Sequence, residues 1–118
     1  MDKAKAIARF WRSYGYYDVP YEQLLWAIEE HFKYRTIETI EVGGEIVAFG
    51  RFNVEGINAT ILDVVVRPDY RHKKLIKLML LRGWKRFPFV KYIQFERGLK
   101  DRKKRRISMK KFLGVKNG

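Results

Sequence analysis

The fold is decided by residues 58–84, which read NATILDVVVRPDYRHKKLIKLMLLRGW. The β-branched apolar run at 61–66 is short enough to predict a strand that is covered on both faces. Pro68 cannot donate to a sheet ladder, so the strand is expected to end there. The apolar residues that follow cover most of the circumference of a predicted helix over about 71–85, with Asp69 as a possible cap.

A strand that runs directly into a helix N-terminus favours anion binding. The N–H groups of the first helical turn have no partner within the helix, and the helix dipole adds partial positive charge. Arg71, His72, Lys73 and Lys74 occupy this turn. The sequence therefore predicts a phosphate site here; the alternative is a basic turn that is only solvated.

The residues before this stretch predict two helices and an antiparallel meander. Apolar residues at three- and four-residue spacing indicate the helices, and Gly43-Gly44 is typical of a tight hairpin turn. The expected elements are helices at about 2–13 and 20–33, and strands at about 36–42, 45–53 and 58–67.

The residues after it predict a strand at about 90–97 and a last helix at about 103–113. A right-handed crossover through the helix over 71–85 would place the strand over 90–97 parallel to the central strand. The chain is thus expected to form a single α+β (α/β) domain over residues 1–118.

Composition excludes several classes of protein. The 118 residues contain no cysteine, which rules out disulfides, thiolate metal sites and a cysteine nucleophile and fits a reducing cytoplasm. The two histidines lie far apart in sequence, so no metal site is predicted. No apolar run reaches the roughly 18 residues that span a bilayer, and no signal peptide is indicated.

Charge divides the chain at the end of the central strand. Residues 1–66 carry 7 Lys/Arg and 10 Asp/Glu, a net charge of −3, whereas residues 67–118 carry 19 and 3, a net charge of +16; together they give the formal +13. Such a field attracts polyanions, including nucleic acid, acidic proteins and nucleotide cofactors.

The central stretch resembles the core motif of the GNAT acetyltransferase superfamily, an apolar strand followed by V-x-P-x-Y-R-x-x-G-x-G/A and a helix. The matching residues are Val66, Pro68, Tyr70 and Arg71. The two small positions of the motif fall on Lys74 and Ile76, so the pyrophosphate loop is degenerate relative to the family. The length of the chain, its F-P-x-V-x-Y-I-x-x-E-R stretch at 87–97 and its basic tail also resemble those of small phage or mobile-element members.

This resemblance implies a GNAT-like fold: an antiparallel meander, a splayed parallel strand pair and flanking helices, lacking the C-terminal strands of the family. It implies acetyl-CoA as co-substrate and an amine as acceptor. A sheet that ends early leaves a free edge, which makes a homodimer possible. The residues that would bind acetyl-CoA are Val65, Val66, Arg67, Arg71, His72, Lys73 and Lys74.

Acetyl transfer in this family needs a proton acceptor and often a tyrosine acid. The candidate bases are Glu96, on the splayed strand, and Asp63, on the central strand. Each could instead be a surface carboxylate that pairs with the abundant Lys and Arg. The last helix has no tyrosine, and Tyr92 is the candidate substitute.

The alternative function is a GNAT-fold protein that has lost catalysis. Lys74 and Ile76 favour this alternative because glycine at those positions lets a backbone approach phosphates closely. Such a protein would bind nucleic acid or a protein partner through its basic C-terminal half. The candidate contact is the run Arg102, Lys103, Lys104, Arg105 and Arg106.

Overall fold

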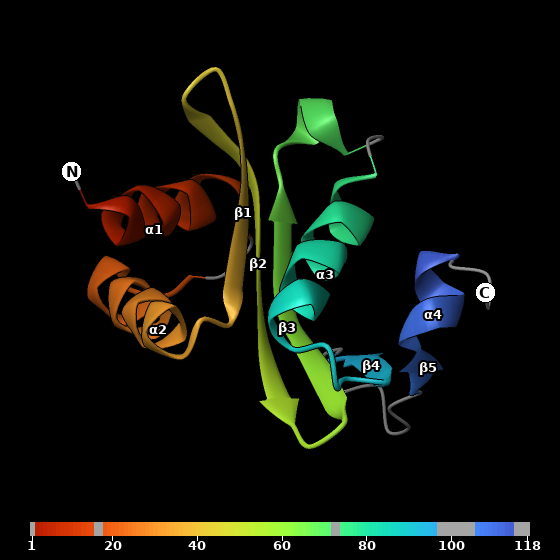
Figure 1. Cartoon of the computed structure of the whole chain (residues 1–118). Helices are drawn as coiled ribbons and strands as arrows, with labels where there is room; N and C mark the ends of the chain where they lie inside the picture. The colour runs from red at the N-terminus through yellow and green to blue at the C-terminus, as the bar shows by residue number, and fades with distance from the viewer. Residues whose placement is uncertain (1, 16–17, 72–73, 97–105, 115–118) are drawn as a thin grey trace.

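In the part of the chain that this computed structural model describes, residues 2–15, 18–71, 74–96 and 106–114, five strands form one sheet in the order β1-β2-β3-β4-β5 (Figure 1). The β3–β4 pair is parallel and the other pairs are antiparallel, which confirms the predicted α+β class. The elements are α1 (Lys3–Tyr14), α2 (Tyr21–Tyr34), β1 (Ile37–Val42), β2 (Glu45–Glu55), β3 (Asn58–Val66), a 3-10 turn (Pro68–Tyr70), α3 (Leu75–Arg86), β4 (Tyr92–Phe95), β5 (Ile107–Ser108) and α4 (Met109–Leu113).

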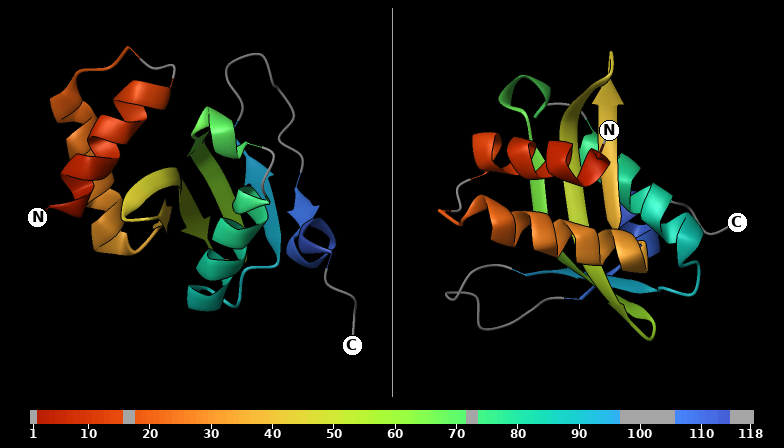
Figure 2. Two further views of the ribbon diagram at one scale, coloured as in Figure 1. Left: turned by 90° about the horizontal axis from the view of Figure 1, so that it is seen from above. Right: turned by 90° about the vertical axis from the view of Figure 1, so that its left-hand side faces the viewer.

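The helices cover both faces of the sheet. Figure 2 shows α1 and α2 on one face and α3 on the other. On the first face, Ile7, Trp11 and Ile28 pack against Phe49 of β2, and all four are buried. On the second face, Leu80 of α3 belongs to a cluster with strand residues, so the sheet lies between two apolar layers.

A β-bulge in β3 redirects the middle of the sheet. Arg51 of β2 lies opposite Asp63, but the next residue, Phe52, lies opposite Ile61, so Leu62 is an extra residue on β3. Because side chains alternate along a strand, the bulge moves Ile61 to the α3 face while Asp63 stays on the face of α1 and α2. Ile61 accordingly packs in one cluster with Phe52 and Leu80.

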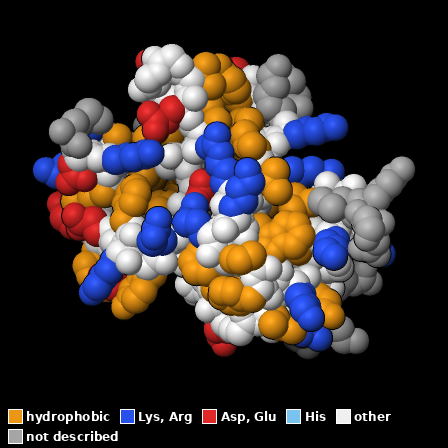
Figure 3. Space-filling view, viewed as in Figure 1, with side chains coloured by type: hydrophobic (Ala, Val, Ile, Leu, Met, Phe, Trp, Pro, Cys, Tyr) orange, Lys and Arg blue, Asp and Glu red, His pale blue; other side chains and the backbone are white. Residues whose placement is uncertain are grey.

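Two arginines of α3 bind the outer edge of β1. Arg82 Nη1 donates to Thr39 O at 3.1 Å, and Arg86 Nη2 donates to Ile37 O at 3.4 Å. Arg86 also forms an ion pair with Glu38. These guanidinium groups therefore satisfy backbone carbonyl groups that an edge strand would otherwise leave open to pairing with another chain. Figure 3 shows Lys and Arg side chains gathered where α3 meets this edge of the sheet.

The predicted start of the central helix is corrected. The helix was expected from residue 71 with Asp69 as cap, but α3 begins at Leu75 and its N-cap, Lys74, makes no side-chain cap bond. Pro68 instead starts a 3-10 turn in which Tyr70 N–H donates to a carbonyl before the proline at 2.8 Å. Asp69 accepts from Arg67 Nε at 2.7 Å and is therefore used within that turn.

The C-terminal prediction is also corrected. Of the helix expected over 103–113, residues 103–105 lie outside the described part, residues 107–108 form β5, and helix is present only at Met109–Leu113. Ile107 pairs with the fully buried Ile93, and the Ser108 hydroxyl accepts from Lys111 N as the helix cap. The edge of β4 that was expected to be free is thus paired at Tyr92 and Ile93.

Candidate functional site

A groove opens where β3 and β4 separate. The strands pair in parallel from Asn58, opposite Tyr92, to Ile61, opposite Phe95, and Glu96 N–H then donates to Ile61 O at 2.9 Å. β3 continues to Val66 without β4 beside it. A groove of about 900 Å³ occupies this space, so the predicted splay of the parallel pair is confirmed.

The exposed edge of β3 presents backbone groups to this groove. Arg67 N–H donates to a β2 carbonyl at 2.8 Å. Hydrogen-bonding direction alternates along a strand, so Val65 also turns its backbone toward β2, whereas Val64 and Val66 turn theirs toward the groove. Val66 O accordingly accepts from Arg71 Nε at 3.4 Å. An extended ligand could pair with this edge as an added strand.

The N-terminus of α3 closes one end of the groove. Lys74, Leu75, Ile76 and Lys77 all line it. The first helical bond runs from Leu78 N–H to Lys74 O at 3.2 Å, so the preceding N–H groups carry the free donors of a helix start. The Lys74 side chain does not cap them, and Lys74 and Lys77 are exposed cations at the same place. This end of the groove is therefore suited to an anion.

Ile76 stands where the family motif has a small residue. Its side chain is 38% exposed and forms part of the groove wall. The groove keeps its volume of about 900 Å³ with this side chain present. Ile76 therefore narrows the approach to the helix start without closing the groove.

Asp63 lines the groove, but its carboxylate is held in a buried ion pair. Its side chain is 5% exposed, and Oδ2 accepts from Arg51 Nε at 2.5 Å. Arg51 also lies 4.9 Å from the ring centroid of Trp11 and donates through Nη1 to His31 Nε2 at 3.2 Å. The Asp63 carboxylate is therefore committed to Arg51 rather than to a group in the groove.

His31 completes this network in a neutral form. Its Nε2 accepts from Arg51, so the proton is on Nδ1, which donates to Thr36 Oγ1 at 2.7 Å. Burial lowers the pKa of the His31 imidazole below its ordinary value of 6.5, and the positive charge of Arg51 lowers it further. Neutral His31 therefore accepts a hydrogen bond from Arg51 and helps to orient the guanidinium toward Asp63.

Glu96 is the carboxylate that is free to act. It is exposed, and it lies at the point where β4 leaves β3. It lines both the groove between the strands and a second groove of about 790 Å³ on the α2 side, which Asp63 also lines. Among the described residues, no ion pair involves Glu96. A group in either groove can therefore reach its carboxylate.

Tyr92 and Glu96 lie at opposite ends of β4. Four residues along a strand span about 13 Å, and Tyr92 lines neither groove. The guanidinium carbon of Arg106 instead lies over the Tyr92 ring, 4.8 Å from its centroid. The tyrosine that does line the groove is Tyr14, 38% exposed at the end of α1. Tyr14 is not among the residues that the sequence analysis predicted for the site; it is the last residue of α1, just before Gly15.

The remaining predicted residues are divided between several places. Val65, Val66, Arg71 and Lys74 line the groove. Arg67 does not: it bonds Asp69 and Glu45, and the hydrogen bonds to Asp69 raise its pKa. His72, Lys73 and residues 102–105 lie outside the described residues. Arg106 Nη1 donates to Asn58 Oδ1 at 3.2 Å.

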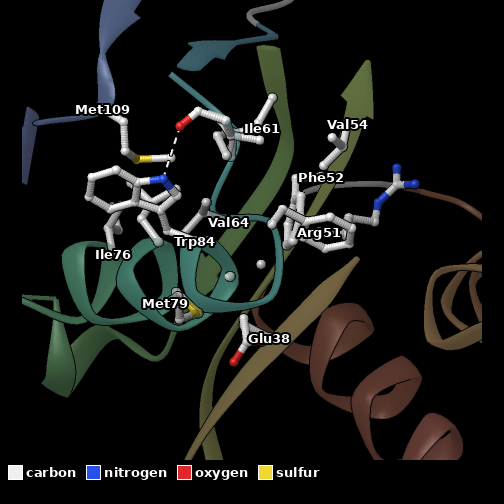
Figure 4. Close-up of a pocket in the computed structure, with 16 residues that line it drawn as sticks. Glu38, Arg51, Phe52, Val54, Ile61, Val64, Ile76, Met79, Trp84 and Met109 are labelled. Carbon is white, nitrogen blue, oxygen red and sulfur yellow. Dashed lines mark hydrogen bonds between the residues drawn. The ribbon is translucent and has the colours of Figure 1, made fainter. Parts of the chain in front are cut away.

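A separate cavity under α3 is too small for a ligand. Figure 4 shows Phe52, Val64 and Met79 converging on it, whereas the guanidinium of Arg51 points away. Its volume is about 30 Å³ and its wall is almost entirely apolar. Trp84 Nε1 beside it is satisfied by Val90 O at 2.9 Å. This cavity is a packing defect of the core rather than a binding site.

Neither a metal site nor a membrane-spanning helix is found in the described part of the chain. No group of three or more His, Cys, Asp or Glu residues there is arranged to hold a metal ion. No helix there has the length and apolar character to cross a bilayer.

Comparison with known proteins gives a family and a fold. The sequence pattern of the acetyltransferase (GNAT) family matches residues 2–85. A comparison with curated proteins finds no match. Solved structures with similar folds include the diaminobutyrate acetyltransferase EctA from Paenibacillus lautus in complex with L-2,4-diaminobutyric acid and coenzyme A, at 18% identity and TM-score 0.63, over 79% of this chain and 58% of that one.

Two others are the PaiA N-acetyltransferase from Thermoplasma acidophilum with coenzyme A, at 18% identity and TM-score 0.54, and aminoglycoside N-acetyltransferase AAC(6')-Iy with CoA, at 15% identity and TM-score 0.65. The alignments cover 78% and 85% of this chain, and 66% and 75% of those chains. At these identities the likeness establishes the fold. The chain spans less than two thirds of the length of the diaminobutyrate and PaiA enzymes.

Proposed function

Because this chain belongs to the acetyltransferase (GNAT) family, we propose that it transfers an acetyl group from acetyl-CoA to an amine acceptor. The observation that carries the proposal is the groove at the divergence of β3 and β4. It combines a free strand edge, a helix N-terminus with exposed cations and an available carboxylate within one space.

Acetyl-CoA is an extended molecule with a diphosphate near one end, and the groove matches both features. The pantetheine arm would pair with the backbone of Val64 and Val66 as an added strand. The diphosphate would then lie at the first turn of α3, beside Arg71 and Lys74. His72 and Lys73, which follow Arg71 in sequence, complete the proposed set, so that cationic side chains replace the backbone contacts of the family's glycine-rich loop.

Glu96 is proposed as the general base. It takes a proton from the ammonium form of the acceptor, directly or through one water. The neutral nitrogen then attacks the thioester carbonyl carbon, and the carbon–sulfur bond breaks as the amide forms. The second proton of the nitrogen passes to water as the intermediate collapses, and the thiolate of CoA takes up a proton. Tyr14, whose side chain lines the groove, is the proposed donor of that proton. Asp63 and Tyr92 are not given proton-transfer roles in this mechanism.

The test starts with calorimetric titration of acetyl-CoA at low and physiological salt. Turnover is then followed through release of the CoA thiol, for which this chain gives no background because it contains no cysteine. Glu96→Gln is expected to lower turnover by about 10²-fold. The matched control is Glu29→Gln, an exposed carboxylate of α2 that lines neither groove. An unchanged rate in Glu96→Gln would remove Glu96 from this role.

The titration also tests the alternative of an inactive, nucleic-acid-binding protein. Nothing in the comparisons supports that alternative, and of its five candidate residues only Arg106 lies in the described part of the chain. Micromolar binding of acetyl-CoA that persists at physiological salt argues for the transferase. Binding that disappears with salt and is matched by RNA or DNA argues for the alternative, since phosphate contacts are strongly salt-dependent.

Three narrower expectations accompany the proposal. They are a cytoplasmic location, a phage-like origin of the chain with its degenerate pyrophosphate loop, and a homodimer through a free sheet edge. Sedimentation of the purified chain tests the last of them directly, and a monomer would remove it.

A further inference from the structure

The second groove runs along α2 and joins the proposed catalytic carboxylate to an exposed tryptophan. Glu96 and Asp63 lie in its wall together with Glu22 and Trp26. Trp26 also lines the next groove, of about 720 Å³, with Glu30. The two grooves share Trp26, Ala27 and Arg51 in their walls, so they adjoin along the helix, and together they are called the trough.

Three side chains of α2 form a row along this trough. Glu22, Trp26 and Glu30 are spaced four residues apart, which places them on one helix face. The Trp26 side chain is 67% exposed, although it is a large apolar ring on a helix whose Leu24 and Ile28 are buried. An indole face between two carboxylates is a combination that attracts cations.

The charge of the trough is opposite to that of the protein. The only cation in its wall among the described residues is Arg51, apart from neutral His31, and Arg51 is committed to Asp63. No ion pair of the described residues involves Glu22 or Glu30. The groove between β3 and β4 instead carries exposed Arg and Lys at its helix end. One molecule therefore offers a cationic groove and an anionic trough, and Glu96 belongs to both.

We propose that the row Glu22–Trp26–Glu30 is a subsite for a second cationic group of the acceptor. This rests on the proposed function: one ammonium group of an elongated oligoamine would react beside Glu96, and another would lie over the Trp26 ring between the two carboxylates. The substrate class is then an unbranched amine with at least two positive charges. Acetylation removes only the charge at the reacting end, so the ammonium group at the other end stays bound to the subsite until the product dissociates.

The activity test compares α,ω-diamines of increasing length with the monoamine of the same length, at saturating acetyl-CoA. We expect a clear preference in kcat/KM for diamines above the length that spans from Glu96 to Trp26. Trp26→Ala should reduce this preference by about 3- to 5-fold through KM, with kcat unchanged. Trp26→Phe should retain part of it, because phenylalanine keeps an aromatic face. Glu22→Gln combined with Glu30→Gln should also reduce it, whereas the control Glu29→Gln should not.

The binding test separates this subsite from the proposed activity. Calorimetry with the same diamines and monoamines, without acetyl-CoA, needs no turnover. Tighter binding of the diamine that is lost in Trp26→Ala supports the subsite even if no amine is acetylated, in which case only the proposed function fails. Equal affinity for diamine and monoamine overturns the subsite even if acetyl transfer occurs. A Trp26→Ala variant that changes sedimentation but not diamine affinity also overturns it, because Trp26 would then be a contact between chains.

Discussion

Replacing Arg51 by methionine is expected to destabilise the sheet substantially. Arg51→Met keeps much of the side-chain volume but leaves the Asp63 carboxylate, 5% exposed, without its guanidinium partner. Breaking a buried ion pair on one side typically costs 3–5 kcal/mol. Arg51 itself is 22% exposed, so some water reaches the pair, and we expect a loss of about 2–4 kcal/mol in the free energy of unfolding.

The assay is urea unfolding of the wild type, Arg51→Met, Asp63→Leu and the double variant Arg51→Met/Asp63→Leu. The double variant should recover most of the loss, because no charge is left buried, and the cycle then yields a coupling energy of about 2 kcal/mol. The matched control is Lys3→Met, which breaks an exposed pair with Glu41 and should cost less than about 1 kcal/mol. A loss in Arg51→Met no larger than in Lys3→Met would refute the account of Asp63 as a buried, guanidinium-dependent charge.

Three further predictions concern stability. The pKa of His31 is lowered in the folded protein, so below pH 6.5 the unfolded chain binds a proton at this ring more readily, and the free energy of unfolding should fall as pH falls. His31→Gln should flatten this dependence between pH 7.5 and 5.5. Equal pH dependence of unfolding in the wild type and the variant would contradict the prediction. Gly50→Ala places its Cβ at 3.5 Å or more from its neighbours and should raise stability by about 0.5–1 kcal/mol; a lower melting temperature would show that the site has no room. Gly15→Ala brings its Cβ to 2.6 Å from Trp11 Cδ1 and should cost about 1–3 kcal/mol in urea unfolding, and a neutral result would disprove this close approach.

The order of the elements was predictable because each has a local cause. Gly43 and Gly44 do adopt positive φ, 60° and 82°, at the turn between β1 and β2. Pro68 does end the central strand, since β3 stops at Val66. A short apolar strand followed by a proline and an apolar helix leaves few ways to connect the parts, which is why the parallel pair could be anticipated. Its splay was expected only from the resemblance to the GNAT superfamily.

The bulge at Leu62 could not be predicted, and it determines the chemistry of the site. No residue in 58–66 indicates a bulge by itself, because the register depends on how β2 lies against β3. Without the extra residue, the backbone of Val65 rather than that of Val64 and Val66 would face the groove. The bulge also places Asp63 beside Arg51, on the face of α1 and α2, so a carboxylate that appears available in the sequence is already paired.

The two corrected helix boundaries have the same origin. β-Branched Ile107 is held by pairing with Ile93, and Pro68 starts a 3-10 turn, so in both places a tertiary or backbone constraint overrides an apolar pattern of helical period. Tyr14 was missed for a related reason. Tyr14 is four residues after Phe10, a spacing typical of packing within a helix, and the two ring centroids lie 4.9 Å apart. Only the fold shows that the C-terminal end of α1 reaches the groove.

The charge division of the sequence gains a physical meaning from the fold. The net positive charge after residue 66 begins where α3 presents its N-terminus, so it lies beside the groove proposed for the diphosphate. The acidic excess before residue 66 includes Glu22 and Glu30, which line the trough along α2. A donor that carries phosphates and an acceptor that carries ammonium groups would each be attracted to its own side of the sheet and repelled from the other. Glu96 is one of 3 acidic residues in the basic half, and like Asp63 it borders both grooves. Among the described residues, a guanidinium holds Asp63 and none holds Glu96. In the proposed mechanism, the arrangement that would separate the two substrates by charge therefore places Glu96, which has no ion-pair partner among the described residues, where they would meet.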